Sequence, residues 1–176
     1  MMKIYLRDAT LDDSQLIVKW HNSPKIINHS FNKTPISVES NRIFFHDNVE
    51  TGNYRQFIVE RIDDDFSVVS YPIATVYLKD IDNINKRCEL CIFTSDDQEW
   101  NSESQRIAVK MLLDKAFFEY GMHKVYSYVF SEFIDEAEML KKSGFRVEAI
   151  LRDEAKDSAG EYANVIRFCV FNKDDK

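Results

Sequence analysis

The stretch that decides the fold is SQRIAVKMLLDKAFFEY, residues 104–120, which has the clearest helical repeat in the chain. Its apolar side chains recur at helical spacing on two adjacent rows. One row holds Ala108, Leu112, Ala116 and Tyr120, and the next holds Val109, Leu113 and Phe117. Gly121 is a natural stop for this helix. A helix with a broad apolar face must cover another element, so the flanking segments identify its partner.

Short segments that are typical of strands lie on both sides of this helix. Before it come residues 56–62, 70–78 and 87–94, joined by connections short enough for an antiparallel meander. After it come a strand at 124–130, a short helix at 134–142 ended by Gly144, and two strands at 145–152 and 161–171. These runs predict a sheet that the long helix covers.

The N-terminal part predicts one strand and two helices. A strand covers residues 4–6, a helix begins at Thr10 with an acid three residues later, and another begins at Ser37. The resulting order, β-α-α-β-β-β-α-β-α-β-β, predicts an α+β fold with a mostly antiparallel mixed sheet flanked by helices. We find no repeat or linker and expect one domain, residues 1–176.

The charge and the apolar pattern exclude several kinds of partner. The formal net charge is −7 and the pI is about 5.1, which argues against binding a nucleic-acid backbone. No apolar run approaches the ~20 residues of a membrane helix, so we expect no membrane partner. The opening residues lack a signal-peptide core, which predicts a cytoplasmic protein. The acidic residues 63–65 are interpreted as a solvated turn.

Cysteine and glycine usage narrows the chemistry further. Cys88, Cys91 and Cys169 are an odd number of cysteines, and we expect reduced thiols. The first two form a C-x-x-C in a strand, where this spacing sends them to opposite faces, so we expect no metal site. Only four glycines occur, none within five residues of another, which excludes a P-loop and a G-x-G-x-x-G loop.

Several stretches, in their order and spacing, resemble the GNAT acetyltransferase superfamily, and in particular its ribosomal-protein alanine N-acetyltransferase branch. The stretches are Tyr5-Leu6-Arg7 with Thr10-Leu11-Asp12-Asp13, Lys19-Trp20-His21-Asn22 with Pro24, Leu78-Lys79-Asp80-Ile81-Asp82 with Asn85-Lys86-Arg87-Cys88-Glu89-Leu90, Gly144-Phe145, and Gly160-Glu161-Tyr162-Ala163-Asn164. The resemblance covers essentially the whole chain.

The resemblance implies an acyltransferase that holds acetyl-CoA between its fourth and fifth strands, here residues 87–94 and 124–130. Backbone groups near Ile92, Phe93 and Thr94 would bind the pantetheine arm. The start of the long helix would hold the pyrophosphate, as helix N-termini do for anions in general. The implied phosphate-binding residues here are Ser102, Ser104, Gln105 and Arg106.

The chain departs from the family pattern at two places. The family's phosphate loop has a Gln or Arg, two free positions, and then Gly-x-Gly or Gly-x-Ala; the two small positions are Glu103 and Gln105 here. Side chains obstruct close backbone approach, and Glu103 adds a negative charge beside the phosphates. After the fifth strand, Phe133 and Leu140 stand where the family often has Asn and Tyr, so neither donates a proton.

Direct acyl transfer to an amine needs a base, an oxyanion contact and a proton for the thiolate. Glu89, on the fourth strand, is the candidate base, with His21 and His46 as further candidates. Tyr128, or Tyr126 beside it, is the candidate acid. Trp20 and Asn22 are candidates for lining an acceptor pocket, although a tryptophan at a helix end is more often core.

The sequence thus predicts an acetyl-CoA-dependent N-acetyltransferase that acts on a primary amine of a small molecule or of a protein N-terminus. Two alternatives remain at this point. One is a catalytically degenerate GNAT-fold protein that serves as a binding or assembly partner, and the other is an enzyme that uses another acyl donor such as a carrier protein. Because dimers are common in this fold, a homodimer is also expected.

Overall fold

The computed structural model describes residues 3–63 and 69–174. Its strands are β1 (Lys3–Asp8), β2 (Arg55–Asp63), β3 (Val69–Asp82), β4 (Arg87–Cys91), β5 (Lys124–Phe130), β6 (Arg146–Lys156) and β7 (Tyr162–Phe171). Its α-helices are α1 (Ser14–His21), α2 (Pro24–His29), α3 (Val38–Phe44), α4 (Ser102–Asp114) and α5 (Ile134–Lys142). Short non-α turns precede α1 (η1, Leu11–Asp13) and extend α3 (η2, Phe45–Val49) and α4 (η3, Lys115–Glu119).

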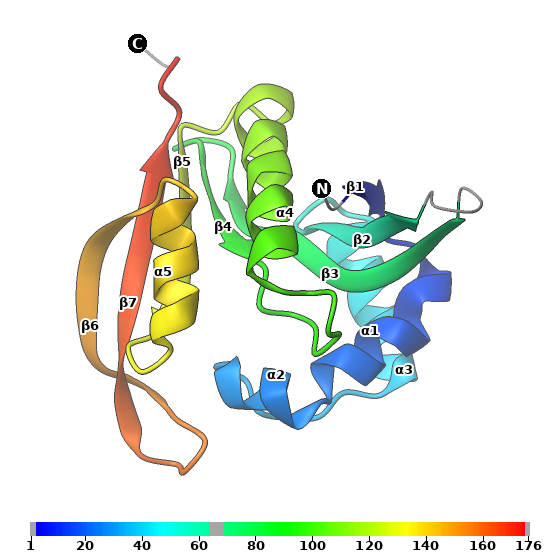
Figure 1. Cartoon of the computed structure of the whole chain (residues 1–176), viewed down its shortest axis with the longest axis horizontal. Helices are drawn as coiled ribbons and strands as arrows, with labels where there is room; N and C mark the ends of the chain where they lie inside the picture. Colours follow the sequence, from blue (N-terminus) through cyan, green and yellow to red (C-terminus); the bar gives the residue numbers. More distant parts are fainter. Residues whose placement is uncertain (1–2, 64–68, 175–176) are drawn as a thin grey trace.

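The strands form one seven-stranded sheet in the order β1-β2-β3-β4-β5-β7-β6 (Figure 1). Its pairs are antiparallel except β4 with β5, which is parallel. The predicted α+β architecture with a mostly antiparallel mixed sheet is therefore confirmed. Of the acidic turn predicted at residues 63–65, only Asp63 lies among the described residues.

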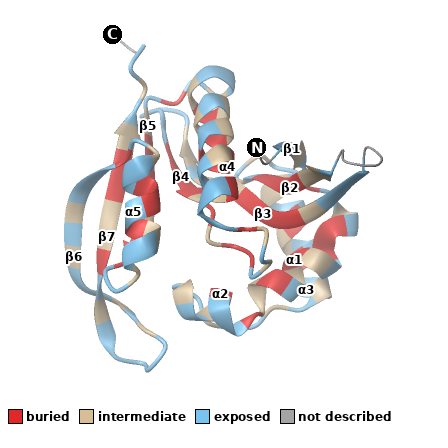
Figure 2. Ribbon diagram, viewed as in Figure 1, coloured by how far each residue is buried: buried red, intermediate tan, exposed pale blue. Residues whose placement is uncertain are grey.

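Helices cover both faces of the sheet, and the alternation along β2 shows how. Phe57 and Val59 face the larger apolar cluster, which also contains Ala108 and Leu112 of α4. Ile58 points to the opposite face, into a smaller cluster with residues of α1 and η2. A strand covered on both faces is apolar along its length, and residues 56–60 of β2 are all buried. Figure 2 shows this burial concentrated in the inner strands, whereas β6 is largely exposed.

The helix that the sequence did not predict, α2, has a clear local cause. The Ser23 side chain accepts a hydrogen bond from the backbone N–H of Ile26, and Pro24 occupies the first helical position. With only six residues, α2 is too short to show a helical repeat. Among the described residues, no helix is both long enough and apolar enough to cross a membrane.

Strand β4 ends at Cys91, three residues before the predicted end at Thr94. Side chains donate hydrogen bonds to backbone carbonyl groups at this point. The Trp100 indole N–H donates to the Ile92 carbonyl oxygen at 2.9 Å. The Thr94 hydroxyl likewise donates to the carbonyl of Thr75 on β3. The chain therefore leaves the β4–β5 ladder at this point, and this departure shapes the functional site.

Candidate active site

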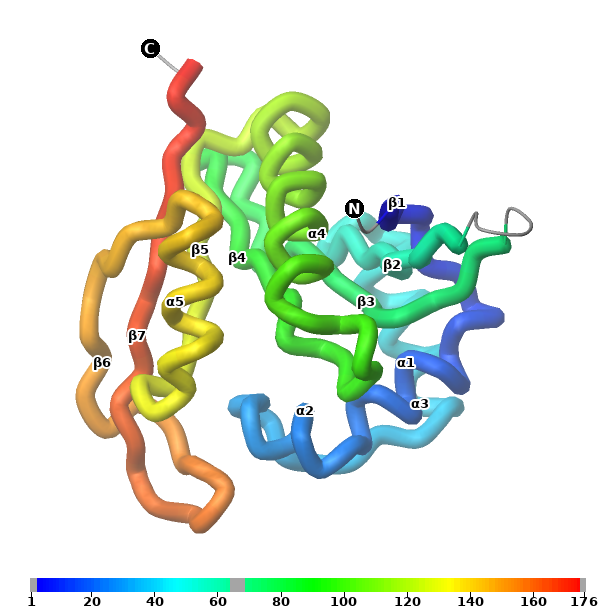
Figure 3. Tube along the Cα trace, in the orientation of Figure 1, coloured from blue at the N-terminus to red at the C-terminus, as the bar shows by residue number. Residues whose placement is uncertain are grey.

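Strands β4 and β5 separate after a short parallel contact. Their register contains only three pairs, from Arg87 with Lys124 to Glu89 with Tyr126. Beyond them, the Ser127 hydroxyl on β5 donates to the Leu90 carbonyl oxygen at 2.9 Å. The trace in Figure 3 shows the two strands running apart from here, which leaves a gap in the backbone pairing of the sheet.

Beside this gap lie backbone donors that have no partner among the described residues. Within the described ranges, the N–H groups of Phe93 and Thr94 donate to no other group. Both residues line the same cavity, described next. Unpaired backbone donors beside a cavity are costly unless a ligand or water accepts from them, so this segment is suited to hold an extended, acceptor-rich ligand.

A cavity of about 520 Å³ continues from the gap to the face of the sheet under α1, α2 and α3. Ligand pockets of small-molecule sites commonly have this size. Its walls come from α1 to α3 with the intervening segment, and from β2 to β5 with the residues that follow β4. The lining residues are Ile17, His21, Ile26, His29, Ser30, Phe31, Asn32, Ile36, Ser40, Asn41, Phe44, Tyr54, Gln56, Thr75, Tyr77, Lys79, Glu89, Leu90, Cys91, Ile92, Phe93, Thr94, Ser127 and Tyr128.

Glu89 is the carboxylate of this cavity. Its side chain is buried, and its Oε1 lies 3.3 Å from Lys79 Nζ on the neighbouring strand. The Cys91 thiol also donates to Oε1, at 3.3 Å, whereas Oε2 accepts no hydrogen bond from the described chain. Burial raises the pKa of Glu89 above its ordinary value, although Lys79 acts in the opposite direction. A carboxylate with a raised pKa can take up a proton nearer to neutral pH.

Cys91 lies on the same face of β4 as Glu89, and Cys88 is buried on the opposite face, as the C-x-x-C spacing predicted. Burial, together with the Glu89 carboxylate, raises the pKa of the Cys91 thiol well above its ordinary value. The thiol therefore stays protonated and donates to Glu89. A neutral thiol is a poor nucleophile, so this geometry does not favour acyl transfer through Cys91.

Tyr128 lines the cavity on β5, two residues beyond Tyr126, the register partner of Glu89. The two tyrosine rings meet edge to face with centroids 5.8 Å apart. The Arg167 guanidinium lies over both rings, 4.3 Å from the Tyr126 centroid and 5.6 Å from that of Tyr128. Burial raises the pKa of Tyr126 to about 12, and this ring is not among the lining residues. Tyr128 is therefore the better placed of the two candidate acids.

Neither of the predicted pocket residues Trp20 and Asn22 is among the described lining residues. Trp20 is only 2% exposed and belongs to the smaller core cluster. The Asn22 amide instead holds the backbone of Ile36 from both sides, at 2.8 and 2.9 Å, and Ile36 does line the cavity. Asn22 thus supports a wall of the cavity without reaching its interior.

The two candidate histidines differ in position. His21 lines the cavity, and its buried Nε2 has no hydrogen-bond partner in the described chain. His46 is half exposed on η2 and pairs with Glu50 one turn later at 2.8 Å. His46 therefore has no place in the cavity, whereas His21 lies beside it.

The start of α4 is closed by its own cap. Asn101 Oδ1 accepts from the backbone N–H groups of Glu103 and Ser104, at 3.0 and 3.4 Å. The Ser104 hydroxyl is fully buried and donates to the carbonyl oxygen of Glu99 at 2.7 Å. The Gln105 side chain donates to the Trp100 carbonyl oxygen at 3.4 Å. Ser104 and Gln105 are therefore occupied inside the loop.

The remaining members of this loop face solvent. Ser102, Glu103 and Arg106 are all exposed. Water and salt screen the repulsion between an exposed carboxylate and a phosphate, so Glu103 obstructs an anion less than its position in the sequence suggests. Ser102 and Arg106 are the side chains of this loop that remain available to an anion.

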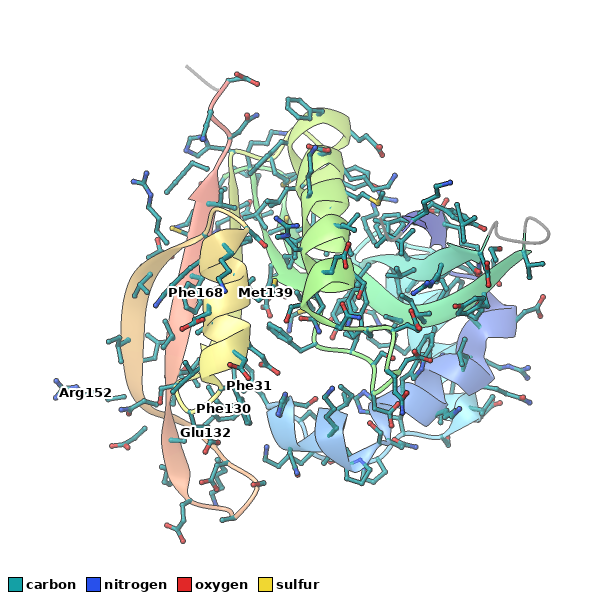
Figure 4. The ribbon with its side chains drawn as sticks, in the orientation of Figure 1. Phe31, Phe130, Glu132, Met139, Arg152 and Phe168 are labelled. Carbon is teal, nitrogen blue, oxygen red and sulfur yellow. The ribbon has the colours of Figure 1, made fainter. Side chains whose placement is uncertain are left out.

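Sequence reasoning missed a bridge along the wall of the cavity, formed by residues 28–33 at the end of α2 and directly after it. His29 Nδ1 pairs with the Glu136 carboxylate of α5, and the His29 ring lies tilted against Phe133, with ring centroids 3.7 Å apart. Phe31 packs edge to face on Phe130, at 5.2 Å between centroids (Figure 4). Phe133 therefore serves as an apolar contact, and Leu140 is fully buried in the larger cluster, with no proton to donate. A phenylalanine among polar residues, Phe31, was the only signal in the sequence.

The model of the acetyltransferase (GNAT) domain family matches residues 3–146. The chain belongs to the GNAT acetyltransferase family. It is accordingly an acyltransferase with acetyl-CoA as its co-substrate, and the gap between β4 and β5 is where the resemblance led us to expect that molecule. No curated protein sequence gives a significant match to this GNAT chain.

Solved structures with the same fold cover nearly the whole of this GNAT chain. A spermidine N-acetyltransferase from Vibrio cholerae, in complex with CoA and spermine, is 22% identical with a TM-score of 0.84, covering 96% of this chain and 95% of that one. A spermidine/spermine N-acetyltransferase from Vibrio cholerae with manganese ions is 22% identical with a TM-score of 0.76, covering 96% and 92%. At this identity the likeness confirms the GNAT fold.

Proposed function

We propose that this GNAT protein transfers the acetyl group of acetyl-CoA to a primary amine bound in the cavity beside Glu89. The observation that carries the proposal is the buried Glu89 carboxylate, which has a raised pKa and faces the cavity next to the gap between β4 and β5. The family supplies the donor, and the cavity supplies a base at the place where donor and acceptor would meet.

The donor is held mainly by backbone. The N–H groups of Phe93 and Thr94 donate to the amide oxygens of the pantetheine arm, while the backbone at Ile92 stays fixed by the Trp100 indole. The anionic end of the donor lies toward the start of α4, where Ser102 and Arg106 are exposed. Because Asn101 already occupies two of the helix N–H groups, phosphate binding there requires its side chain to turn away.

Transfer then needs three proton movements. Glu89 accepts a proton from the ammonium of the acceptor through its unoccupied Oε2, and the neutral nitrogen attacks the thioester carbonyl carbon. The new C–N bond replaces the C–S bond, the Tyr128 hydroxyl gives its proton to the departing thiolate, and the resulting tyrosinate takes the second proton that the nitrogen must lose to become an amide. Since Cys91 stays a neutral thiol, the transfer is direct and forms no acyl-enzyme on it.

The bridge of residues 28–33 supports a small-molecule amine over a protein N-terminus. It joins the end of α2 to α5 through the His29–Glu136 pair and contacts β5 through Phe31 and Phe130, which narrows the way in from that side. The structural neighbours named as spermidine N-acetyltransferases also act on small amines. A ribosomal-protein branch, a homodimer, a cytoplasmic location and a single domain over residues 1–176 remain proposals from the sequence.

The experiment is an acetyl-transfer assay on the purified chain. Acetyl-CoA is supplied with a panel of primary amines, release of the CoA thiol is followed with a thiol reagent, and acetylated amine is identified by mass spectrometry. We expect thiol release that depends on both the amine and the protein. If acetyl-CoA raises the melting temperature but no amine is acetylated, the cavity binds the donor without catalysis and the proposal is wrong.

A further inference from the structure

The cavity contains very little negative charge, although the whole chain carries −7. Among the described residues that line it, Glu89 is the only carboxylate. Lys79 also lines the cavity and lies 3.3 Å from that carboxylate. Burial alone would lower the pKa of Lys79, but the Glu89 carboxylate beside it acts in the opposite direction, and the pKa is raised, so Lys79 stays a cation. The cavity is therefore close to neutral overall.

A neutral cavity with one carboxylate suits an acceptor with one amine. Each ammonium that leaves water needs an opposite charge or good hydrogen-bond acceptors to offset its lost hydration. The acceptor nitrogen finds Glu89, but a second or third ammonium on the same molecule would find no other carboxylate among the described residues of the walls. The Lys79 ammonium would also repel it.

Aromatic and aliphatic side chains form most of the remaining wall. Phe44 of α3 meets Tyr54 edge to face with centroids 4.9 Å apart, and Tyr54 in turn lies 5.6 Å from Tyr77 of β3. Phe31 closes the opposite side, 6.1 Å from Tyr128. The aliphatic lining residues are Ile17, Ile26, Ile36, Leu90 and Ile92. Binding an apolar surface against such a wall is favourable, because it removes apolar area from water, whereas binding a hydrated, charged chain there is not.

Two of the polar groups between these rings are already paired. The Gln56 side-chain amide donates to the Thr75 hydroxyl at 3.0 Å, and that hydroxyl donates to the Phe57 carbonyl oxygen at 3.0 Å. They therefore offer little to a second cationic group. The strongest unshared acceptor in the cavity is Oε2 of Glu89.

We propose that the acceptor is a monoamine with an apolar or aromatic body, and not a polyamine. This inference rests on the proposed function, because it concerns the acceptor of the same cavity. The amine lies at Glu89, and the body lies along the rings of Phe44, Tyr54 and Tyr77. The acceptor thus differs in chemistry from the spermidine and spermine of the neighbouring structures, with which the chain shares its fold.

The test compares amines that differ by a single charge. Hexylamine and hexamethylenediamine have the same chain length, and only the second carries two ammonium groups; phenethylamine and spermidine complete the set. Binding is measured by calorimetry, with and without saturating CoA. We expect hexylamine and phenethylamine to bind at least about tenfold more tightly than hexamethylenediamine and spermidine, because a desolvated ammonium without a partner is costly. Equal or tighter binding of the diamine or of spermidine would overturn the inference.

Turnover of the same amines separates this inference from the proposed function. If hexylamine binds more tightly than the diamine but is not acetylated, the selectivity stands and the proposed function fails. If spermidine is acetylated with the higher kcat/KM and also binds more tightly, the proposed function stands and the inference fails.

A variant pair at the rim tests the cause of the selectivity. Ser40 lines the cavity at the start of α3, where it forms a capping box with Ser37. Glutamate and glutamine are both compatible with this cap, so Ser40→Glu adds a carboxylate and Ser40→Gln is its neutral control. We expect Ser40→Glu to shift the affinity ratio toward hexamethylenediamine by about two- to fivefold, the range of an exposed ion pair. A ratio that is the same in both variants would contradict the electrostatic cause.

Discussion

Replacing Glu89 by glutamine tests the proposed base with the least change in shape. The amide keeps the size of the buried side chain but cannot accept the proton of the acceptor ammonium. Loss of a general base typically lowers the rate about 10²–10⁴-fold, which corresponds to about 3–5 kcal/mol of transition-state stabilisation. The assay is CoA thiol release under saturating acetyl-CoA and amine, so that the effect appears in kcat. Binding of acetyl-CoA should change little, because the donor is held by the backbone of residues 92–94.

The pH profile identifies the base. Burial raises the pKa of Glu89, so in the wild-type protein activity should fall as the pH drops through this raised pKa, at a higher pH than for an ordinary carboxylate. The acid limb should vanish in Glu89→Gln and persist, at a lower rate, in Glu89→Asp. A structural role alone would lower the rate without removing the limb.

The control is Glu60→Gln, at the other buried carboxylate of the sheet. Glu60 is 5% exposed, against 6% for Glu89, and it also pairs with a cation, Arg7 Nε at 2.9 Å. It does not line the cavity, so this variant should lose stability in urea with little change in kcat. The reasoning is refuted if Glu89→Gln keeps the wild-type kcat and the acid limb of the pH profile, and so cannot be distinguished from the control Glu60→Gln.

Three further changes test the loop and the fold. Asn101→Gly frees two backbone N–H groups at the start of α4 and costs the cap only a few tenths of a kcal/mol; calorimetry should show acetyl-CoA binding about twofold tighter, the fold-change that corresponds to this free energy, since two side-chain hydrogen bonds no longer compete. Trp100→Phe removes the indole donor of the buried Ile92 carbonyl, which keeps the Thr94 hydroxyl at 3.4 Å as a longer contact, and urea unfolding should show a loss of about 0.5–1.5 kcal/mol with a higher KM for acetyl-CoA. Asp13→Asn weakens the contact with Arg7, which helps hold the pKa of Asp13 below its ordinary value against burial; the stability difference from wild type should be full above about pH 4 and shrink as the pH falls through the lowered pKa. Each assignment has its own contradicting result. For the first variant it is an unchanged affinity for acetyl-CoA, for the second an unchanged KM, and for the third a stability difference that does not depend on pH.

Much of the fold was predictable because local patterns and the tertiary structure agree. The strand at Lys124–Phe130 and the helix at Ile134–Lys142 begin and end where the pattern predicted. The ends of other elements depend on groups that are distant in the chain. Strand β4 stops at Cys91 because Trp100 and Thr94 bind carbonyl groups that a longer ladder would have used. A periodicity of two along one strand contains no information about such contacts.

The sequence could predict which residues of the strands belong to the candidate site, but not which residues of other elements surround them. Alternation along β4 places Glu89 and Cys91 on one face, and this required only the strand assignment. The Lys79 partner of Glu89 depends on the register of β3, which includes a shift after Lys79 that no local pattern indicates. The contact of Phe31 with Phe130 joins residues far apart in the chain, so it follows only from the folded structure.

Hydrogen–deuterium exchange with and without acetyl-CoA tests the central claim most directly, that the donor lies between β4 and β5. The N–H groups of Phe93 and Thr94 have no acceptor within the described chain, so they should exchange quickly in the free protein. Saturating acetyl-CoA should slow exchange in peptides that cover these two residues. Stabilisation by acetyl-CoA that leaves their exchange unchanged, and protects another part of the chain instead, would contradict this account.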